Sequence, residues 1–382
     1  MKIAILTQPL KSNYGGMLQA FALQKVIKRC GHEVVTIDRR YSQRSLLRTF
    51  LSLSKRLLFR VFSKKIIKDF SVEQYETIFR NTSEFIQQNI VLSEVIDTDD
   101  KIKKHFNEHK YDAVVVGSDQ TWRPCYSPSI YNFYLDFLED REIKKIAYAS
   151  SFGVDNWEYS KLQSARCSAL AKKFDAVSVR ETFGVELCRK YFGIASECVL
   201  DPTLLLSKGD YIAHFNIGST PNSKGKLFTY ILDSSCEKTD IINIVSRNLG
   251  LERFKHQPEM SLERFESKNT KDYVYPSVKG WVKSFHDADY VVTDSFHGCV
   301  FSIIFNKPFL VIANEGRGLS RFKSLLEIFN LEKRLIFKPT DVTMEIISRP
   351  IDWLSVDRIL EKQKKSSIAF LKGALQDDNA RL

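Results

Sequence analysis

The sequence predicts an α/β protein built from two doubly wound, Rossmann-like lobes. Two observations lead to this fold class. Short apolar runs alternate with helical or loop segments, and the same order begins again after a stretch rich in Lys, Gly, Asn, Ser and Thr. Such alternation is typical of parallel sheets covered by helices on both faces. A chain of 382 residues with 43% hydrophobic content is also long enough for two domains.

The first lobe is expected over residues 1–206 and the second over 226–347, with a linker at 207–225 between them. Buried strands are predicted in the first lobe at 3–6, 34–37, 113–116, 145–150, 176–179 and 198–200. In the second lobe, strands are predicted at 227–232, 290–293 and 308–313, and helices at 240–249, 277–286, 296–305 and 319–329. A final helix within 348–382 is expected to pack back on the first lobe.

The charge of the chain is concentrated in one segment. The formal net charge is +11, and residues 44–68 alone carry eight cationic residues and no acidic one. Apolar residues recur there at helical spacing, so a basic helical insertion is predicted at 42–105. Its basic face either contacts an anionic membrane surface or is simply solvated while the insertion packs on the first lobe. No nucleic-acid-binding motif is present, so a nucleic-acid partner is not expected.

Other bulk features narrow the class of protein. No apolar run is long enough to cross a bilayer, and the N-terminus does not resemble a signal peptide, so a cytoplasmic location is expected. The seven cysteines are scattered singly, which argues against disulfides and a structural zinc site. We expect neither a metal nor another cofactor. The phosphate-binding loop, the dinucleotide fingerprint and the metalloprotease motif are all absent.

Polar residues directly after the predicted strands are the first candidates for a site, because ligands of such sheets bind beyond the carboxyl ends of the strands. These positions carry the motifs GSDQTW at 117–122, SSFG at 150–153, SVRE at 178–181 and DSFHG at 294–298. The last of these opens a predicted helix. A loop that contains Asn13, Gly15 and Gly16 precedes the first helix.

The ordered set VVVGSDQTW, YASSFG, SVRE, LDPTLLL and DYVVTDSFHGCVFSIIFNKPF resembles the polysaccharide pyruvyl transferase family, and NYGGMLQAFAL fits the same group. The resemblance spans roughly residues 2–331. It implies a glycosyltransferase-B-like fold whose active site lies in the cleft between the lobes. It also implies transfer of a pyruvyl group from phosphoenolpyruvate to a sugar hydroxyl pair of a bacterial surface polysaccharide or its lipid-linked precursor, forming a ketal.

Ketal formation needs an acid, a base and groups that hold a doubly anionic donor. His297 is the candidate acid and base, because imidazole titrates near neutral pH; the alternative is a histidine that caps its helix or packs in the interface. Arg180, which matches the arginine of SVRE, is the preferred anion ligand, with an ion pair to Glu181 as its alternative. Arg317 and Arg321 are further candidates, unless they are merely solvated.

The chain departs from the family at Ser295. Many members carry arginine at this position, two residues before the histidine, so Ser295 is a donor-site position that lacks the expected cation. Arg317 or Arg321 is expected to supply the charge instead. Because of this departure, a non-catalytic relative of the family remains an alternative. The runner-up function is a glycosyltransferase that uses a nucleotide sugar, for which Glu315 is a loose candidate to bind the ribose.

The acceptor sugar is expected to meet hydrogen-bonding groups and an aromatic face in the cleft. The candidate acceptor or cleft residues are Asn13, Gly15, Gly16, Ser118, Asp119, Gln120, Trp122 and Ser151. Each has a structural alternative: an ordinary βα turn for the glycine loop, a helix cap for Asp119 and a core position for Trp122. The turn that begins at Asp201 is interpreted as structural.

Overall fold

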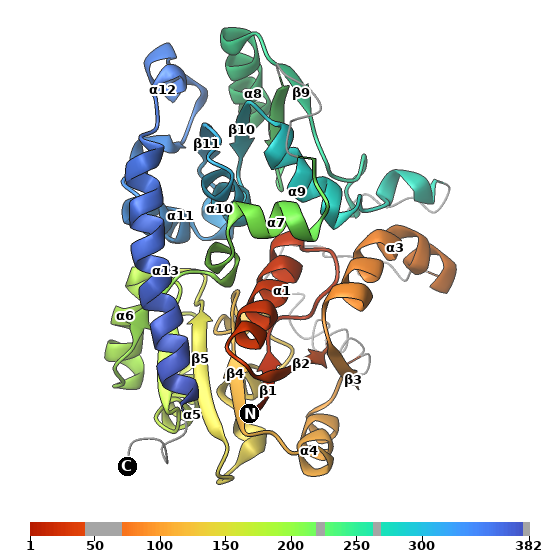
Figure 1. Ribbon diagram of the computed structural model, residues 1–382, viewed down its shortest axis with the longest axis vertical. Helices are drawn as coiled ribbons and strands as arrows, with labels where there is room; N and C mark the ends of the chain where they lie inside the picture. Colours follow the sequence, from red (N-terminus) through yellow and green to blue (C-terminus); the bar gives the residue numbers. More distant parts are fainter. Residues whose placement is uncertain (43–70, 219–225, 263–268, 377–382) are drawn as a thin grey trace, which may run out of the picture.

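The computed structural model describes residues 1–42, 71–218, 226–262 and 269–376. Two α/β lobes lie one above the other in Figure 1, with the first lobe at the bottom and the second at the top. Each lobe contains one parallel sheet, of seven strands in the first lobe and five in the second. The predicted fold class is therefore confirmed.

The sheet of the first lobe has the strand order β3-β2-β1-β4-β5-β6-β7. Its strands are β1 (Lys2–Leu6), β2 (Glu33–Arg39), β3 (Leu92–Ile96), β4 (Ala113–Val116), β5 (Lys144–Ser150), β6 (Ala176–Val179) and β7 (Glu197–Cys198). The central strands β1 and β4 are apolar and buried apart from Lys2 at the start of β1, because helices cover both faces of the sheet. These helices are α1 (Tyr14–Arg29), α3 (Val72–Asn89), α4 (Asp99–Glu108), α5 (Lys161–Ala171) and α6 (Thr182–Leu187).

The sheet of the second lobe has the order β12-β11-β10-β8-β9. Its strands are β8 (Lys226–Tyr230), β9 (Glu252–Phe254), β10 (Tyr290–Thr293), β11 (Phe309–Ile312) and β12 (Leu335–Ile336). The helices of this lobe are α8 (Cys236–Leu249), α9 (Val278–Asp287), α10 (Phe296–Ile304), α11 (Leu319–Ile328) and α12 (Met344–Ser348). Helix α10 is buried at every position, which explains why its sequence after the capping residue is largely apolar, with His297 and Ser302 as the polar exceptions.

The two lobes share one hydrophobic core rather than touching only at a hinge. Helix α1 is buried on nearly all sides, because it lies between its own sheet and the second lobe. The ring of Tyr14 stacks on Trp281 of α9 with their centroids 5.5 Å apart, and its hydroxyl donates to the carbonyl of Pro276 at 2.8 Å. Buried apolar side chains thus hold the lobes in a fixed relation.

Helix α13 (Trp353–Leu375) runs along one side of both lobes (Figure 1) and packs on the first. Ser367 of α13 accepts a hydrogen bond from the backbone N–H of Leu200 at 3.0 Å, and Phe370 lies against Tyr148 of β5. Helix α13 therefore adds a second connection between the lobes.

Two regions differ from the sequence-based interpretation. The range 42–105 is only partly an insertion, because it also contains β3, the edge strand of the sheet, and the start of α4. The range 207–225 contains helix α7 (Lys208–His214) and is therefore not simply a linker. The basic segment 44–68, with its membrane hypothesis, lies outside the described residues. Among the described helices, none combines the length and apolar character that a bilayer span requires.

Candidate functional site

A cavity of about 580 Å³ lies where the two lobes face each other. Loops that follow β1, β2, β4, β8, β10 and β11 line it with Gln8, Pro9, Asn13, Tyr41, Asp119, Gln120, Tyr126, Leu232, Asp233, Asp294, Ser295, Phe296, His297, Gly316, Arg317 and Arg321. The strand order reverses between β1 and β4 in the first sheet and between β8 and β10 in the second. The cavity therefore lies at the switch points of both lobes, where sheets of this kind bind ligands.

His297 enters this cavity from the second lobe and meets a carboxylate of the first. Its ring belongs to the first turn of α10 and is 6% exposed. Its Nε2 lies 3.5 Å from Oδ2 of Asp201, a residue that is buried completely by the fold. Within the described residues, Nε2 has no hydrogen-bond partner closer than this. A buried carboxylate beside one imidazole nitrogen can fix the orientation of the ring.

Asp201 is held in place from several sides. Its Oδ1 accepts hydrogen bonds from the N–H and hydroxyl of Thr203 at 3.0 and 2.7 Å, and its Oδ2 accepts one from Arg180 at 2.8 Å. Burial opposes ionisation of Asp201, but the charges of His297 and Arg180 and these hydrogen bonds outweigh it, so the pKa of this carboxyl lies well below its ordinary range. Asp201 is therefore a carboxylate at neutral pH.

Gly15 allows the His297 ring to approach the first lobe. A Cβ atom at Gly15, in the first turn of α1, would lie 2.0 Å from Nδ1 and 2.1 Å from Cγ of His297. These separations are far shorter than any non-bonded contact between such atoms. The absence of a side chain at this one position is what lets the imidazole lie against α1.

We expect Gly15→Ala to lower catalytic turnover about 100-fold, because the methyl group pushes the imidazole out of line with Asp201 and with the substrate. Helix α1 itself should persist, since alanine favours helix more than glycine does. Steady-state kinetics of the purified variant measures the effect. Gly373→Ala in α13 is the matched control, because a Cβ there meets nothing within 4 Å. Unchanged turnover in Gly15→Ala would contradict a role for the position of the ring.

Arg180 lies beneath the cavity rather than in its lining. Its Nε donates to Glu181 at 3.1 Å, its Nη1 to Asp201 at 2.8 Å, and its Nη2 is 3.7 Å from Asp119. Burial alone would lower the pKa of this guanidinium, but the three neighbouring carboxylates raise it by a larger amount. The pKa of Arg180 therefore lies above the usual value of an arginine. The ion pair with Glu181, the structural alternative for Arg180, is thus present, and Arg180 reaches the cavity only through its neighbours.

Arg321 has the opposite environment. Its side chain lines the cavity, is 6% exposed and has no carboxylate within ion-pair distance among the described residues. Its Nη2 donates to the carbonyl of Arg317, while its buried Nε has no partner. Burial and the nearby charge of Arg180 lower the pKa of Arg321 to about 10, so it stays protonated at neutral pH. A buried cation without a counter-ion at a cavity wall is suited to bind an anion.

The other two donor-site candidates also line the cavity. Arg317 is half-exposed and forms a two-point ion pair with Asp233, so its charge is already matched. Ser295 is the N-cap of α10, where its hydroxyl accepts a hydrogen bond from the N–H of Gly298 at 3.4 Å. Arg321 therefore provides an unmatched cation in the same cavity as Ser295, where the resemblance implies that a cation is missing.

The candidate acceptor residues fall into two groups. Asn13, Asp119 and Gln120 line the cavity, and the amide of Asn13 donates to Asp119 at 3.4 Å. The others do not line it. Ser118 and Ser151 are buried, where Ser118 donates to the carbonyl of Ala149 at 3.0 Å and Ser151 to Glu181 at 2.5 Å. Gly15 and Gly16 lie in the first turn of α1, not in a loop.

The expectation that Trp122 stacks on a sugar is wrong. Its side chain is fully buried, its indole N–H donates to the carbonyl of Phe133 at 3.0 Å, and its ring stacks on Tyr134. Trp122 thus belongs to the core of the first lobe. Tyr41 and Tyr126 are the tyrosines that line the cavity instead, and the hydroxyl of Tyr41 donates to the carbonyl of Tyr126 at 2.5 Å.

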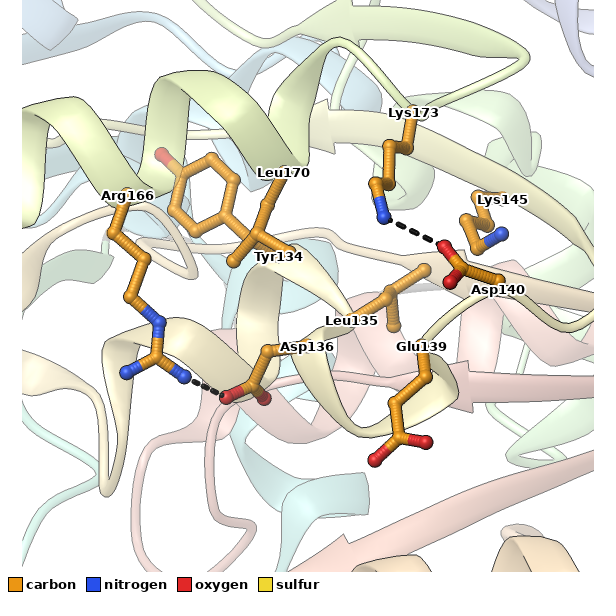
Figure 2. Close-up of a pocket in the computed structure, with 9 residues that line it drawn as sticks. All are labelled: Tyr134, Leu135, Asp136, Glu139, Asp140, Lys145, Arg166, Leu170 and Lys173. Atoms are coloured by element: carbon orange, nitrogen blue, oxygen red, sulfur yellow. Dashed lines mark hydrogen bonds and ion pairs between the residues drawn. The ribbon is translucent and has the colours of Figure 1, made fainter.

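A second, smaller cavity of about 290 Å³ lies at the opposite end of the first sheet, before β5 and β6 (Figure 2). Figure 2 shows Arg166 paired with Asp136, and Lys173 paired with Asp140. In this smaller cavity Arg166 and Lys173 are each already paired with a carboxylate. The cavity does not lie at a switch point of the sheet, and no histidine is among the residues that line it. The larger cavity is therefore the candidate active site.

Comparison with known protein families shows to which family the chain belongs. Its sequence matches the family described as polysaccharide pyruvyl transferase over residues 13–316, which is most of its length. The chain belongs to the polysaccharide pyruvyl transferase family. The matched range ends at Gly316, so it takes in His297, Asp201 and Arg180 and stops before Arg317 and Arg321. A comparison with curated proteins found no match.

Solved structures show that this pyruvyl transferase family member shares its fold with glycosyltransferases. UGT89C1 of Arabidopsis thaliana complexed with UDP-L-rhamnose is similar with a TM-score of 0.54 and 9% identity, over 97% of this chain and 98% of that one. The same protein complexed with UDP gives a TM-score of 0.51 and 8% identity over the same shares. At these identities the likeness concerns the fold alone, and it agrees with the predicted glycosyltransferase-B-like arrangement of the lobes.

Asp201 has a contact beyond the structural turn that the sequence of this pyruvyl transferase family member predicts. The turn is present, because Asp201 caps the short helix that follows it. Its second carboxylate oxygen, however, faces His297 across the lobe interface. One signal was available: an acidic residue just after a strand of the first sheet, at the same edge as the other candidates. Asp233, which follows β8 in the second lobe, carried the same kind of signal, whereas Tyr41 and Tyr126 did not.

Proposed function

We propose that this protein transfers a pyruvyl group from phosphoenolpyruvate to two hydroxyls of a sugar in a surface polysaccharide or its lipid-linked precursor. The observation that carries the proposal is the pairing, in one interlobe cavity, of the carboxylate-backed imidazole of His297 with the unmatched guanidinium of Arg321. Membership of the pyruvyl transferase family supports the same reaction class. The donor is a small molecule with a phosphate and a carboxylate, and it requires both a proton donor and a cation.

The reaction follows from the chemistry of an enol phosphate. Protonation of the methylene carbon of phosphoenolpyruvate makes the neighbouring carbon electrophilic, and one sugar hydroxyl attacks it and loses its proton. Phosphate then leaves, and a second hydroxyl closes the ketal ring. In this proposal His297 moves these protons, and Asp201 orients the imidazole ring through Nε2.

The donor anions are proposed to bind at Arg321 and at the two helix N-termini that reach the cavity. Asn13 and Ser295 are the N-caps of α1 and α10, and both line the cavity. The free backbone N–H groups and the positive dipole end of a helix favour a bound phosphate or carboxylate. Arg317 can bind phosphoenolpyruvate only if it gives up its ion pair with Asp233, whereas Nε of Arg321 has no partner. Arg321 is therefore the primary ligand of the donor substrate.

The acceptor sugar is proposed to occupy the part of the cavity formed by the first lobe. Asp119, Gln120 and Asn13 present carboxylate and amide groups there, and Tyr41 and Tyr126 present aromatic rings. Sugar hydroxyls bind to such polar groups, while the apolar face of a pyranose packs on an aromatic ring. A cavity of about 580 Å³ is within the size range of small-molecule sites and larger than the donor alone requires.

The test is an assay with isotope-labelled phosphoenolpyruvate and a panel of lipid-linked saccharides, with phosphate release measured in parallel. We expect label to enter one acceptor in a 1:1 ratio with released phosphate. A parallel thermal-shift titration compares phosphoenolpyruvate with UDP and UMP. Stabilisation by the uridine nucleotides and not by phosphoenolpyruvate would overturn the proposal in favour of a nucleotide-sugar glycosyltransferase. Binding of neither donor, with no label transfer, would favour a non-catalytic relative.

A further inference from the structure

A cluster of three potential metal ligands lies at the far edge of the first sheet. Glu94 belongs to the edge strand β3, His105 to helix α4 and His109 to the C-cap of that helix. One ligand atom from each of the three lies within 4.8 Å of the other two. The residues of the interlobe cavity follow other strands, so this cluster is separate from the candidate active site.

The spacing of the two histidines follows from the helix. Residues four apart lie on one side of a helix, and the rings of His105 and His109 are 4.5 Å apart between centroids. Nδ1 of His105 lies 2.6 Å from Oε1 of Glu94. Glu94 and His109 are exposed, so both can adjust toward a shared ion, whereas His105 is only 2% exposed and fixed.

The ring of His105 is oriented as in a typical metal site. Its Nε2 lies 3.0 Å from the hydroxyl of Tyr111, which is buried in the core of the first lobe. Without an ion, the 2.6 Å contact makes Nδ1–H a donor to Glu94. When the Tyr111 hydroxyl accepts a hydrogen bond from Nε2–H instead, the lone pair of the imidazole is on Nδ1 and can bind an ion that replaces the Nδ1 proton. Metal-binding histidines usually have such a partner on the second nitrogen, and it fixes both the tautomer and the ring plane.

The three side chains also have the chemistry of cation ligands, since each offers a carboxylate oxygen or an imidazole nitrogen to the same small space. Two imidazoles and one carboxylate, without thiolates, form a donor set preferred by Zn²⁺ and related borderline divalent ions.

We propose that Glu94, His105 and His109 bind one Zn²⁺ ion, with water in the remaining coordination position. The ion joins the edge strand β3 to helix α4, so its effect is to stabilise this edge of the first lobe and not to take part in pyruvyl transfer. The sequence-based expectation of no metal does not foresee this site, because the ligands come from two elements and no cysteine is among them.

Zinc binding to the untagged full-length protein tests the proposal. The protein is first treated with a chelator, and Zn²⁺ is then titrated in competition with a chromogenic chelator. We expect one ion per chain. Glu94→Gln and His109→Ala should each weaken binding at least about tenfold, and Tyr111→Phe, which removes the partner of His105, about tenfold to 100-fold. Glu108→Gln is the matched control, because this exposed glutamate lies on the same helix but pairs with Lys104.

The exposed variants keep the test decisive even if His105→Ala, which alters a buried side chain, fails to fold. Circular dichroism of Glu94→Gln and His109→Ala checks that each is folded before titration. If the wild-type protein takes up no zinc, or if the folded variants bind it as tightly as the wild type and the Glu108→Gln control do, the site is wrong. A rise in the midpoint of thermal unfolding with Zn²⁺ in the wild type, absent from His109→Ala, gives a readout independent of the chelator.

Discussion

His297→Gln is expected to reduce pyruvyl transfer about 100-fold to 10,000-fold, because the side chain of glutamine cannot donate and regain a proton near neutral pH. The neutral amide keeps hydrogen-bonding capacity close to Asp201, so the fold should tolerate the change. Release of labelled phosphate from phosphoenolpyruvate in the presence of acceptor measures the effect on turnover. Thermal-shift titration with phosphoenolpyruvate measures donor binding separately, which should change far less than turnover.

His256→Gln is the control for the histidine change. His256 is partly buried, and its Nε2–H donates a hydrogen bond to the carbonyl of Ser277 at 3.0 Å, outside the cavity. Glutamine can preserve that bond, so turnover should equal that of the wild type. The assignment of His297 is wrong if both variants retain the same turnover. The pH dependence of kcat/KM adds a further criterion. The part of the curve that depends on proton transfer by His297 in the wild type should be absent from His297→Gln.

Arg321→Met is expected to lower kcat/KM for phosphoenolpyruvate about 100-fold to 1,000-fold, while the midpoint of thermal unfolding stays level or rises. Methionine removes the unmatched guanidinium that we propose as the primary donor ligand, and a loss of this size corresponds to about 3–4 kcal/mol. The stability part follows from the same environment. A buried cation without a carboxylate partner destabilises the folded state, and a flexible apolar side chain of similar length relieves this.

Arg166→Met provides the contrast. Arg166 lies in the second cavity and is paired with Asp136 (Figure 2), so its replacement removes a partly exposed ion pair. That change should reduce stability slightly and leave kinetics unchanged. Unchanged kcat/KM in Arg321→Met would remove Arg321 from the donor site. A large loss of stability in this variant would show instead that its role is structural.

The fold could be predicted because the strands that build it are short, apolar and separated by clear helical patterns. The strands at 3–6, 113–116 and 290–293 were found within about one residue, since burial on both faces leaves an unmistakable apolar run. Strand β3 was missed for the opposite reason. It is an edge strand, it is half-exposed, and its sequence LSEVI mixes polar and apolar residues.

The site could be predicted in part. Each strand end marks a position on one edge of a sheet, so the candidates that line the cavity, among them His297, Asp119 and Arg321, were within reach of the sequence. The sequence did not reveal which of these side chains point into the cavity. Trp122 is core and Arg180 is enclosed by carboxylates, because packing within the first lobe decides their direction. Contacts between residues distant along the chain, such as Asp201 with His297 and Glu94 with His105, leave no periodic signal.

The pair formed by Asp201 and His297 is divided between the two lobes, and Gly15 adds a third contact across the same boundary. A separation of the lobes by a few ångströms would leave each lobe folded but would remove the imidazole from its carboxylate. Under the proposed mechanism, proton transfer therefore requires the docked arrangement of the two lobes. The apolar interface around Tyr14 and Trp281, together with helix α13, stabilises this arrangement.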